Sequence, residues 1–177
     1  MSELESELEL DVYIEISKNS HIKYEYDHDK NILICDRVLH TPFKYHFNYG
    51  FIPDTLSLDS DPLDVVVLMD DELVPGCLIK CRFLGYLETE DDAGIDPKII
   101  MCPSNKVDPT YCSLKNITDV SKKTLEKIKY FFSHYKDLEN KQVRVGNFLD
   151  KKDAINIYLK SRDYYEENQQ NLKNKKI

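Results

Sequence analysis

The pattern of apolar and polar residues divides the chain into a β-rich first part and a helical last part. Short alternating or wholly apolar runs, separated by polar turns, are typical of strands. The run from Val65 to Met69 is continuously apolar, which indicates a buried strand, and Pro75-Gly76 marks a turn. The strands predicted in this way cover residues 12–16, 23–27, 32–35, 65–69, 78–87 and 98–102.

Helical periodicity follows in the last third of the chain. Between residues 125 and 138 apolar side chains recur three or four positions apart, and Ser121 is a suitable N-cap, so a helix over residues 122–140 is expected. A strand at residues 142–145 and a second helix at about residues 150–167 complete the prediction. The acidic residues 1–10 and the Asn-, Gln- and Lys-rich residues 168–177 are expected to be flexible tails.

The 177 residues suit one domain with its own core, and neither an internal repeat nor a linker divides them. Several strands followed by two helices predict a mainly β single domain, in which a small β-barrel or curled sheet packs against the helices. Apolar residues make up 41% of the chain, which is enough to argue against wholesale disorder.

Charge and composition narrow the classes of function. The net charge of -8 argues against a nucleic-acid-binding surface and suits a protein that collects cations. The apolar runs are too short to cross a bilayer, and the N-terminus lacks a signal-peptide pattern, so a cytoplasmic location without a membrane partner is expected. The five Cys residues form no Cys-x-x-Cys pair and the five His residues show no zinc-ligand spacing, which favours partly buried free thiols.

The clearest candidate for chemistry is Asp59-Ser-Asp-Pro-Leu-Asp64, which places three carboxylates within six residues. Hard divalent cations bind several oxygen ligands, and clustered carboxylates favour holding more than one ion. A solvated acidic turn is the common alternative for such a segment. An EF-hand calcium loop does not fit, because Leu63 and Asp70 stand where that loop needs an acidic or amide residue and a Glu.

A second acidic segment, Glu90 to Lys98, also contains a turn-forming Gly and Pro, and it would share a metal site with the first if the two meet in space. Basic and phenolic residues supply donors for phosphate, since Arg offers a fork of N–H groups, Lys a point charge and Tyr a neutral donor. Metals and such donors acting on one oxyanion describe a phosphoryl-transfer site, and the chain has no P-loop sequence. The candidate donors are Lys23, Arg37, Lys98, Lys136, Tyr45, Tyr49 and Tyr135.

The segment Asp59-Ser-Asp-Pro-Leu-Asp-Val65 resembles the D-x-D-P-x-D-V signature of the family I soluble inorganic pyrophosphatases. Six further segments are similar to that family in order and approximate spacing, so the resemblance spans about residues 12–148. They are Ile14–Ile16, Ile22–Glu25, Asp36-Arg37, Tyr45–Pro53, Asp91–Lys98 and Phe131–Glu139. The resemblance implies an OB-like five-stranded β-barrel with flanking helices, and Mg²⁺-dependent hydrolysis of inorganic pyrophosphate to two phosphates.

The resemblance also implies roles for individual residues. The metal-binding set would be Asp59, Asp64, Asp91, Asp92, Asp96 and Glu15. The catalytic set would be Asp61 as general base, Tyr49 hydrogen-bonding near the nucleophile and Glu25 acting near the metals. The substrate-binding set would be Lys23, Arg37, Tyr45, Lys98, Tyr135 and Lys136, with Lys98 also supporting the ligand shell.

Three positions depart from the family pattern: Asp92 is one methylene shorter than the usual Glu, His46 replaces a Pro, and residues 142–148 lack the usual Trp. The resemblance further implies a homo-oligomer, with a hexamer expected, in which the helix over residues 122–140 supplies part of the interface through His134. The alternatives are a catalytically altered OB-like barrel that binds metal or nucleic acid, and a calcium-binding structural domain. Phosphate release from pyrophosphate, measured during a Mg²⁺ titration, distinguishes these classes.

Overall fold

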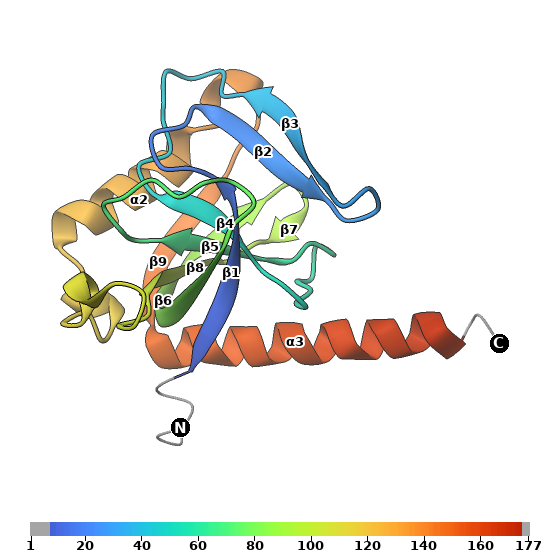
Figure 1. Cartoon of the computed structure of the whole chain (residues 1–177). Coiled ribbons are helices and arrows are strands. Elements are labelled where there is room, and N and C mark those ends of the chain that lie inside the picture. Colours follow the sequence, from blue (N-terminus) through green and yellow to red (C-terminus); the bar gives the residue numbers. More distant parts are fainter. Residues whose placement is uncertain (1–7, 175–177) are drawn as a thin grey trace.

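Five strands close into a ring in the order β1-β4-β5-β8-β6, and β6 pairs with β1 to complete it (Figure 1). The computed structural model describes residues 8–174. The ring strands are β1 (Glu9–Ile16), β4 (Asn48–Ile52), β5 (Leu63–Val67), β8 (Lys98–Pro103) and β6 (Leu78–Asp91). β5 and β8 run parallel, whereas the other neighbours run antiparallel. The expected mainly β fold with an OB-like five-stranded barrel is confirmed.

The other elements surround this ring (Figure 1). A separate hairpin, β2–β3, lies beside β1, while β7 and β9 both pair with β6. The bounds of these elements are β2 (Ile22–Asp27), β3 (Ile32–Val38), β7 (Gly94–Ile95), β9 (Arg144–Asp150), α2 (Lys122–His134) and α3 (Lys151–Asn174). Short 3₁₀ turns are η1 (Pro109–Tyr111), η2 (Ile117–Asp119) and η3 (Asp137–Glu139).

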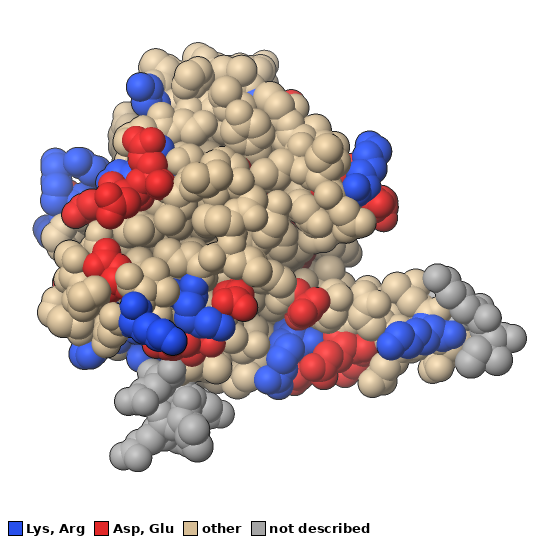
Figure 2. All heavy atoms as spheres, in the orientation of Figure 1, with Lys and Arg blue, Asp and Glu red and all other residues tan. Residues whose placement is uncertain are grey.

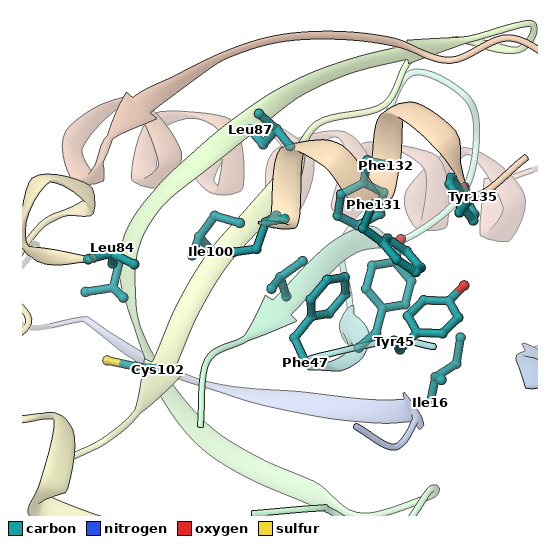
Figure 3. Packing of buried hydrophobic residues seen from close by; sticks show 14 of the residues in the cluster. Ile16, Tyr45, Phe47, Leu84, Leu87, Ile100, Cys102, Phe131, Phe132 and Tyr135 are labelled. Atoms are coloured by element: carbon teal, nitrogen blue, oxygen red, sulfur yellow. The ribbon is translucent and has the colours of Figure 1, made fainter. Parts of the chain in front are cut away.

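Two apolar clusters hold the helices on the barrel. The cluster under α2 is aromatic, and the ring centroids of Phe47, Phe131 and Phe132 lie 5.3 to 5.5 Å apart (Figure 3). The other cluster includes Ala154 and Ile155 from the start of α3. β5 contributes to both clusters, because Val66 packs in the first while Val65 and Val67 pack in the second. This burial on two sides explains its continuous apolar run.

The close approach of β1 to β4 depends on Gly50. A Cβ atom at this position would lie 1.7 Å from the carbonyl oxygen of Tyr13, so no other residue fits without separating the two strands. The β1–β4 register also shifts between Ile14 and Ile16. The ring therefore closes at this point only with glycine.

Several predicted boundaries need correction. The strand predicted at residues 65–69 is Leu63–Val67, because its pairing with β4 begins at Leu63. The helix predicted to end at residue 140 ends at His134, and Leu138 belongs to the separate turn η3, followed by Asn140 with φ of 53°. The strand predicted at residues 142–145 is Arg144–Asp150. β4 and β7 are not among the predicted strands.

The two segments predicted as tails belong to regular elements where the structure describes them. Residues 168–174 continue α3, whose C-terminal end projects past the barrel, and residues 9 and 10 belong to β1 (Figure 1). Glu, Gln and Lys have good helix propensity, so the polar composition of this segment is compatible with a helix. Residues 1–7 and 175–177 lie outside the described part of the chain. No helix within residues 8–174 is long and apolar enough to cross a membrane.

The five cysteines are all free thiols. Cys81 and Cys102 are buried and Cys77 is half-buried, as expected, but Cys35 and Cys112 are exposed.

Candidate active site

A cavity of about 230 Å³ lies where the β2–β3 hairpin, the barrel, the two acidic segments and the end of α2 meet. The fold therefore brings together two acidic segments that are far apart in the sequence. Most of the predicted site residues line this cavity. They are Glu15, Lys23, Glu25, Tyr49, Asp59, Asp61, Asp64, Asp91, Asp96, Lys98, Tyr135 and Lys136.

The first acidic turn is held by its own backbone. Ser57 N donates to the carbonyl oxygen of Asp61 at 2.8 Å, and Ser60, with φ of 70°, adopts the left-handed conformation between the two acids. Asp61 N donates to Asp59 Oδ1 at 3.1 Å. Burial raises the pKa of both carboxyls, and the charges of Asp59 and other acids raise that of Asp61 further. The turn thus concentrates carboxylates that favour an added cation.

The second acidic turn is a tight hairpin between β6 and β7. Gly94 has φ of 118°, a conformation that favours glycine. Ala93 N donates to Asp91 Oδ1 at 2.9 Å, and Asp96 N donates to the carbonyl oxygen of Thr89 at the same distance. These bonds fix Asp91 and Asp96 on either side of the turn, and both line the cavity.

Lys98 links the two acidic segments. Its Nζ lies 2.6 Å from Asp64 Oδ2 and 2.5 Å from Asp96 Oδ2, and its side chain is 5% exposed. Burial opposes the ammonium charge, but the carboxylates outweigh burial and hold the pKa of Lys98 well above its ordinary value. Burial also raises the pKa of Asp96 to about 6, although the charge of Lys98 opposes this rise. The lysine therefore stays charged between the two acids.

Glu15 adds a buried acid from β1. Its Oε2 accepts a hydrogen bond from Tyr26 N at 2.7 Å. Burial raises the pKa of Glu15 to about 8, against the effect of that hydrogen bond, and the charges of Asp64 and Glu25 raise it further. Part of the negative charge of this cavity is therefore suppressed by protonation near neutral pH.

The donor set of the cavity fits a hard divalent cation, because the acids offer only oxygen ligands. Burial, and then the repulsion of neighbouring carboxylates, raises the pKa of Glu15, Asp59, Asp61 and Asp96, and an added cation would relieve that repulsion. In the arrangement of residues 8–174, however, no three His, Cys, Asp or Glu side chains surround one point closely enough to bind a metal. Lys98 lies between Asp64 and Asp96 instead.

Positive charge comes from the hairpin and the end of α2. Lys23 and Arg37 are cross-strand neighbours on β2 and β3. Arg37 Nε lies 2.8 Å from Glu139 Oε1, whose side chain is 6% exposed, so a buried carboxylate fixes the guanidinium. Lys136 Nζ lies 3.5 Å from Asp91 Oδ2. Burial raises the pKa of Tyr135 to about 12, so its hydroxyl keeps its proton. The cavity thus holds donors for an oxyanion beside its acids.

The chain matches the model of the inorganic pyrophosphatase family over residues 12–166. The chain belongs to the inorganic pyrophosphatase family. It is 48% identical over 156 residues to an inorganic pyrophosphatase from Helicobacter pylori, an alignment that covers 88% of this chain and 90% of that relative. It is 45% identical over 155 residues to the inorganic pyrophosphatase of Aquifex pyrophilus, covering 87% and 88%.

Solved structures of pyrophosphatases share the fold. The inorganic pyrophosphatase from Helicobacter pylori superposes with a TM-score of 0.87 at 48% identity, covering 89% of this chain and 94% of that chain. The inorganic pyrophosphatase from Thermus thermophilus superposes with a TM-score of 0.86 at 35% identity, covering 89% and 91%. The family resemblance seen in the signature segments is confirmed.

Three residues that the pyrophosphatase resemblance places in the site do not line the cavity. Arg37 lies beside Lys23 but is not part of the lining. Tyr45 is not part of the lining either, because its ring is 1% exposed and packs 4.8 Å from that of Phe131 (Figure 3). Asp92 is exposed on the turn and is not part of the cavity lining, and its role as a metal ligand stays a prediction.

The structure also adds residues that the sequence reasoning missed. The cavity lining includes Tyr26, His28 and Phe51, and Glu139 holds Arg37 from behind. The place of His28 could have been anticipated, because a short hairpin that carries Lys23 and Glu25 on its first strand brings its turn near the same site. Nothing in the sequence predicted the role of Glu139, apart from its position in the segment Phe131–Glu139 that is similar to the family.

Proposed function

We propose that the chain hydrolyses inorganic pyrophosphate to two orthophosphates in a Mg²⁺-dependent reaction. The observation that carries this proposal is a single cavity, lined by carboxylates from two acidic turns and by Lys23, Lys98 and Lys136, in a chain of the inorganic pyrophosphatase family. Carboxylates alone would repel a polyanionic substrate, so divalent cations have to change the sign of the local charge before pyrophosphate binds.

The residues proposed to hold Mg²⁺ are the acids of the two turns and their neighbours. Asp59, Asp64 and Asp96 are the principal candidates, and Asp91 and Glu15 lie in the same cavity. Bound Mg²⁺ supplies positive charge for the phosphates and lowers the pKa of water. Lys98, fixed between Asp64 and Asp96, keeps these two carboxylates together.

The remaining residues act on the water and on the phosphates. Asp61 accepts the proton of the attacking water, and its raised pKa makes it a stronger base than an ordinary Asp. Burial raises the pKa of Tyr49 well above its ordinary value, so Tyr49 donates a hydrogen bond near the nucleophile. Glu25 contributes negative charge beside Lys23, whose Nζ lies 3.6 Å from Glu25 Oε1.

Binding of the phosphates falls to the donors on the hairpin and at the end of α2. Lys23, Arg37, Lys136 and Tyr135 would contact phosphate oxygens. Their positive charges and the Tyr135 hydroxyl stabilise the departing phosphate, where negative charge develops in the transition state.

The test is phosphate release from pyrophosphate during a Mg²⁺ titration. The expected result is two phosphates for each pyrophosphate at saturating Mg²⁺, with strong loss of turnover in Asp64→Asn. Asp29→Asn is the matched control, because Asp29 is exposed on the hairpin turn and is not part of the cavity lining. Absence of phosphate release at every Mg²⁺ concentration would contradict the proposal.

The second candidate is a binding module without turnover. Nucleic-acid binding requires a track of positive charge. On the face shown in Figure 2, Lys and Arg are mixed with Asp and Glu and form no such track. Metal binding without phosphate release would favour this candidate.

We also propose a cytoplasmic homo-oligomer, with a hexamer as the expected state. α2 exposes Tyr130, 60% accessible, one turn from His134, whose Nδ1 lies 2.8 Å from Asp137 Oδ2. An exposed aromatic ring beside a hydrogen-bonded His–Asp pair suits a contact between copies. Light scattering at assay concentrations tests this, and a monomer at all concentrations would contradict it.

A further inference from the structure

Aromatic rings form one wall of the catalytic cavity. Tyr26, His28 and Phe51, which we call the aromatic ledge, all line it. The His28 ring centroid lies 4.9 Å from that of Tyr26 at 79° and 5.4 Å from that of Phe51 at 61°. Tyr13 supports the ledge from behind, with its ring stacked 5.1 Å from Phe51. The ledge is therefore a packed array rather than a set of loose side chains.

The proposed hydrolysis does not use the aromatic ledge. Pyrophosphate presents only oxygen atoms, which bind cations and hydrogen-bond donors rather than ring faces. Phe51 has no polar side-chain atom, and the Tyr26 hydroxyl donates to Asn31 Oδ1 at 3.2 Å. Phe51 is 6% exposed and mainly fills space, whereas Tyr26 is half-buried and His28 is exposed on the hairpin turn. The imidazole N–H of His28 is a hydrogen-bond donor, but the ring faces of Tyr26 and His28 have no counterpart in the oxygen atoms of pyrophosphate.

We propose that the aromatic ledge stacks against the base of a nucleoside diphosphate whose two phosphates take the place of pyrophosphate. This inference rests on the proposed function, because the same cations would bind the diphosphate. Stacking on an aromatic side chain stabilises a bound base and tolerates any base, since every base has a π face. Nucleoside diphosphates are then competing ligands of the catalytic cavity.

The test compares ADP with ribose 5-diphosphate as inhibitors of pyrophosphate hydrolysis at saturating Mg²⁺. The two compounds share the diphosphate and the sugar and differ in the base. ADP is expected to inhibit competitively, with an inhibition constant about tenfold lower, which corresponds to about 1.4 kcal/mol of added binding. Equal inhibition constants would overturn the proposal.

Two variants locate the effect. His28→Ala and Tyr26→Leu should each raise the inhibition constant of ADP toward that of ribose 5-diphosphate and leave KM for pyrophosphate unchanged. Tyr26→Leu keeps the backbone N–H that binds Glu15. His21→Ala is the matched control, because His21 is exposed and lies outside the cavity lining. A preference for ADP that survives both variants would place the base elsewhere and overturn the proposal.

A calorimetric titration separates this inference from the proposed function. If the chain binds ADP more tightly than ribose 5-diphosphate but releases no phosphate from pyrophosphate, the proposed function is contradicted and base stacking on the aromatic ledge is supported. If it hydrolyses pyrophosphate but binds the two compounds equally, only the proposal of base stacking is contradicted.

Discussion

The Lys98 ammonium lies 2.6 Å from Asp64 Oδ2, and the two residues stand on the paired parallel strands β8 and β5. Both strands are buried, so the Lys98 side chain reaches this carboxylate rather than bulk water. In a medium of low polarity each charge depends on the other, because an unpaired buried ion is strongly destabilising. Lys98 therefore stabilises the barrel in addition to its place in the candidate site.

Lys98→Met should destabilise the chain by about 3–5 kcal/mol, because it leaves Asp64 and Asp96 without their buried counter-charge. Urea denaturation with chelator present measures this. Lys80→Met is the matched control, since Lys80 Nζ lies 2.9 Å from Asp11 Oδ1 in an exposed pair, and about 0–1 kcal/mol is expected there. Saturating Mg²⁺ should restore part of the loss in Lys98→Met. Equal losses in the two variants would contradict a buried ion pair at Lys98.

The stability of the metal-depleted chain should fall as pH rises from about 5 to 8. The folded chain holds a proton on Glu15 up to a pKa of about 8, whereas the ordinary value for the unfolded chain is 4.5. The stabilisation that protonated Glu15 gives the folded chain is complete below the Glu15 pKa of the unfolded chain. It is lost as pH rises through the Glu15 pKa of the folded chain. Asp96, with a pKa raised to about 6, contributes in the same direction at lower pH. Urea denaturation in chelator at several pH values measures the slope.

Glu15→Gln should flatten this dependence between pH 6 and 8, because the amide does not titrate. Glu166→Gln, on the exposed end of α3, should leave the slope unchanged. A slope that is the same in wild type and in Glu15→Gln would show that another group carries it.

Chelation should abolish phosphate release, and Mg²⁺ should restore it. The donors are carboxylate oxygens, and Mg²⁺ requires tighter octahedral geometry than Ca²⁺, which accepts larger and more variable shells. Ca²⁺ is therefore expected to compete with Mg²⁺ and to inhibit. The measurement is turnover of pyrophosphate with each ion alone and with both together. Full activity after exhaustive chelation would refute the metal requirement.

The acidic part of the site could be predicted because its carboxylates are close in sequence and precede a strand. Asp59, Asp61 and Asp64 reach one cavity through a turn of a few residues, and strand alternation fixes the direction of Asp64. Gly94 similarly marks the second turn. Local spacing was sufficient to locate each turn, but only the fold brings the two turns to one cavity.

The rest depends on contacts that local spacing does not encode. Tyr45 has the same chemistry as Tyr49, and only the packing against Phe131 decides that its ring is buried away from the cavity. The approach of the His28 turn depends on how the hairpin lies against β1. The helical state of residues 168–174 follows from continuation of α3, whereas their composition alone resembles that of a tail.

Asp61→Asn should lower turnover by on the order of 10² to 10⁴, the range for loss of general-base catalysis. Asn has nearly the same shape as Asp but cannot accept the proton, and the Asp61 contact that shapes the turn is made by its backbone N–H, so the variant should fold. Burial and neighbouring carboxylates raise the pKa of Asp61, and their effect on this pKa outweighs the opposing effect of the Lys23 charge. The loss should appear in kcat rather than in KM.

The control for Asp61→Asn is Asp59→Asn, measured across a Mg²⁺ titration. If Asp59 is a metal ligand, its variant should need more Mg²⁺ and recover part of its turnover as the concentration rises. Asp61→Asn should stay slow at saturating Mg²⁺, because added metal does not replace a proton acceptor. Recovery of Asp61→Asn to near wild-type turnover would make Asp61 another ligand. The proton of the attacking water would then have to leave by a different group.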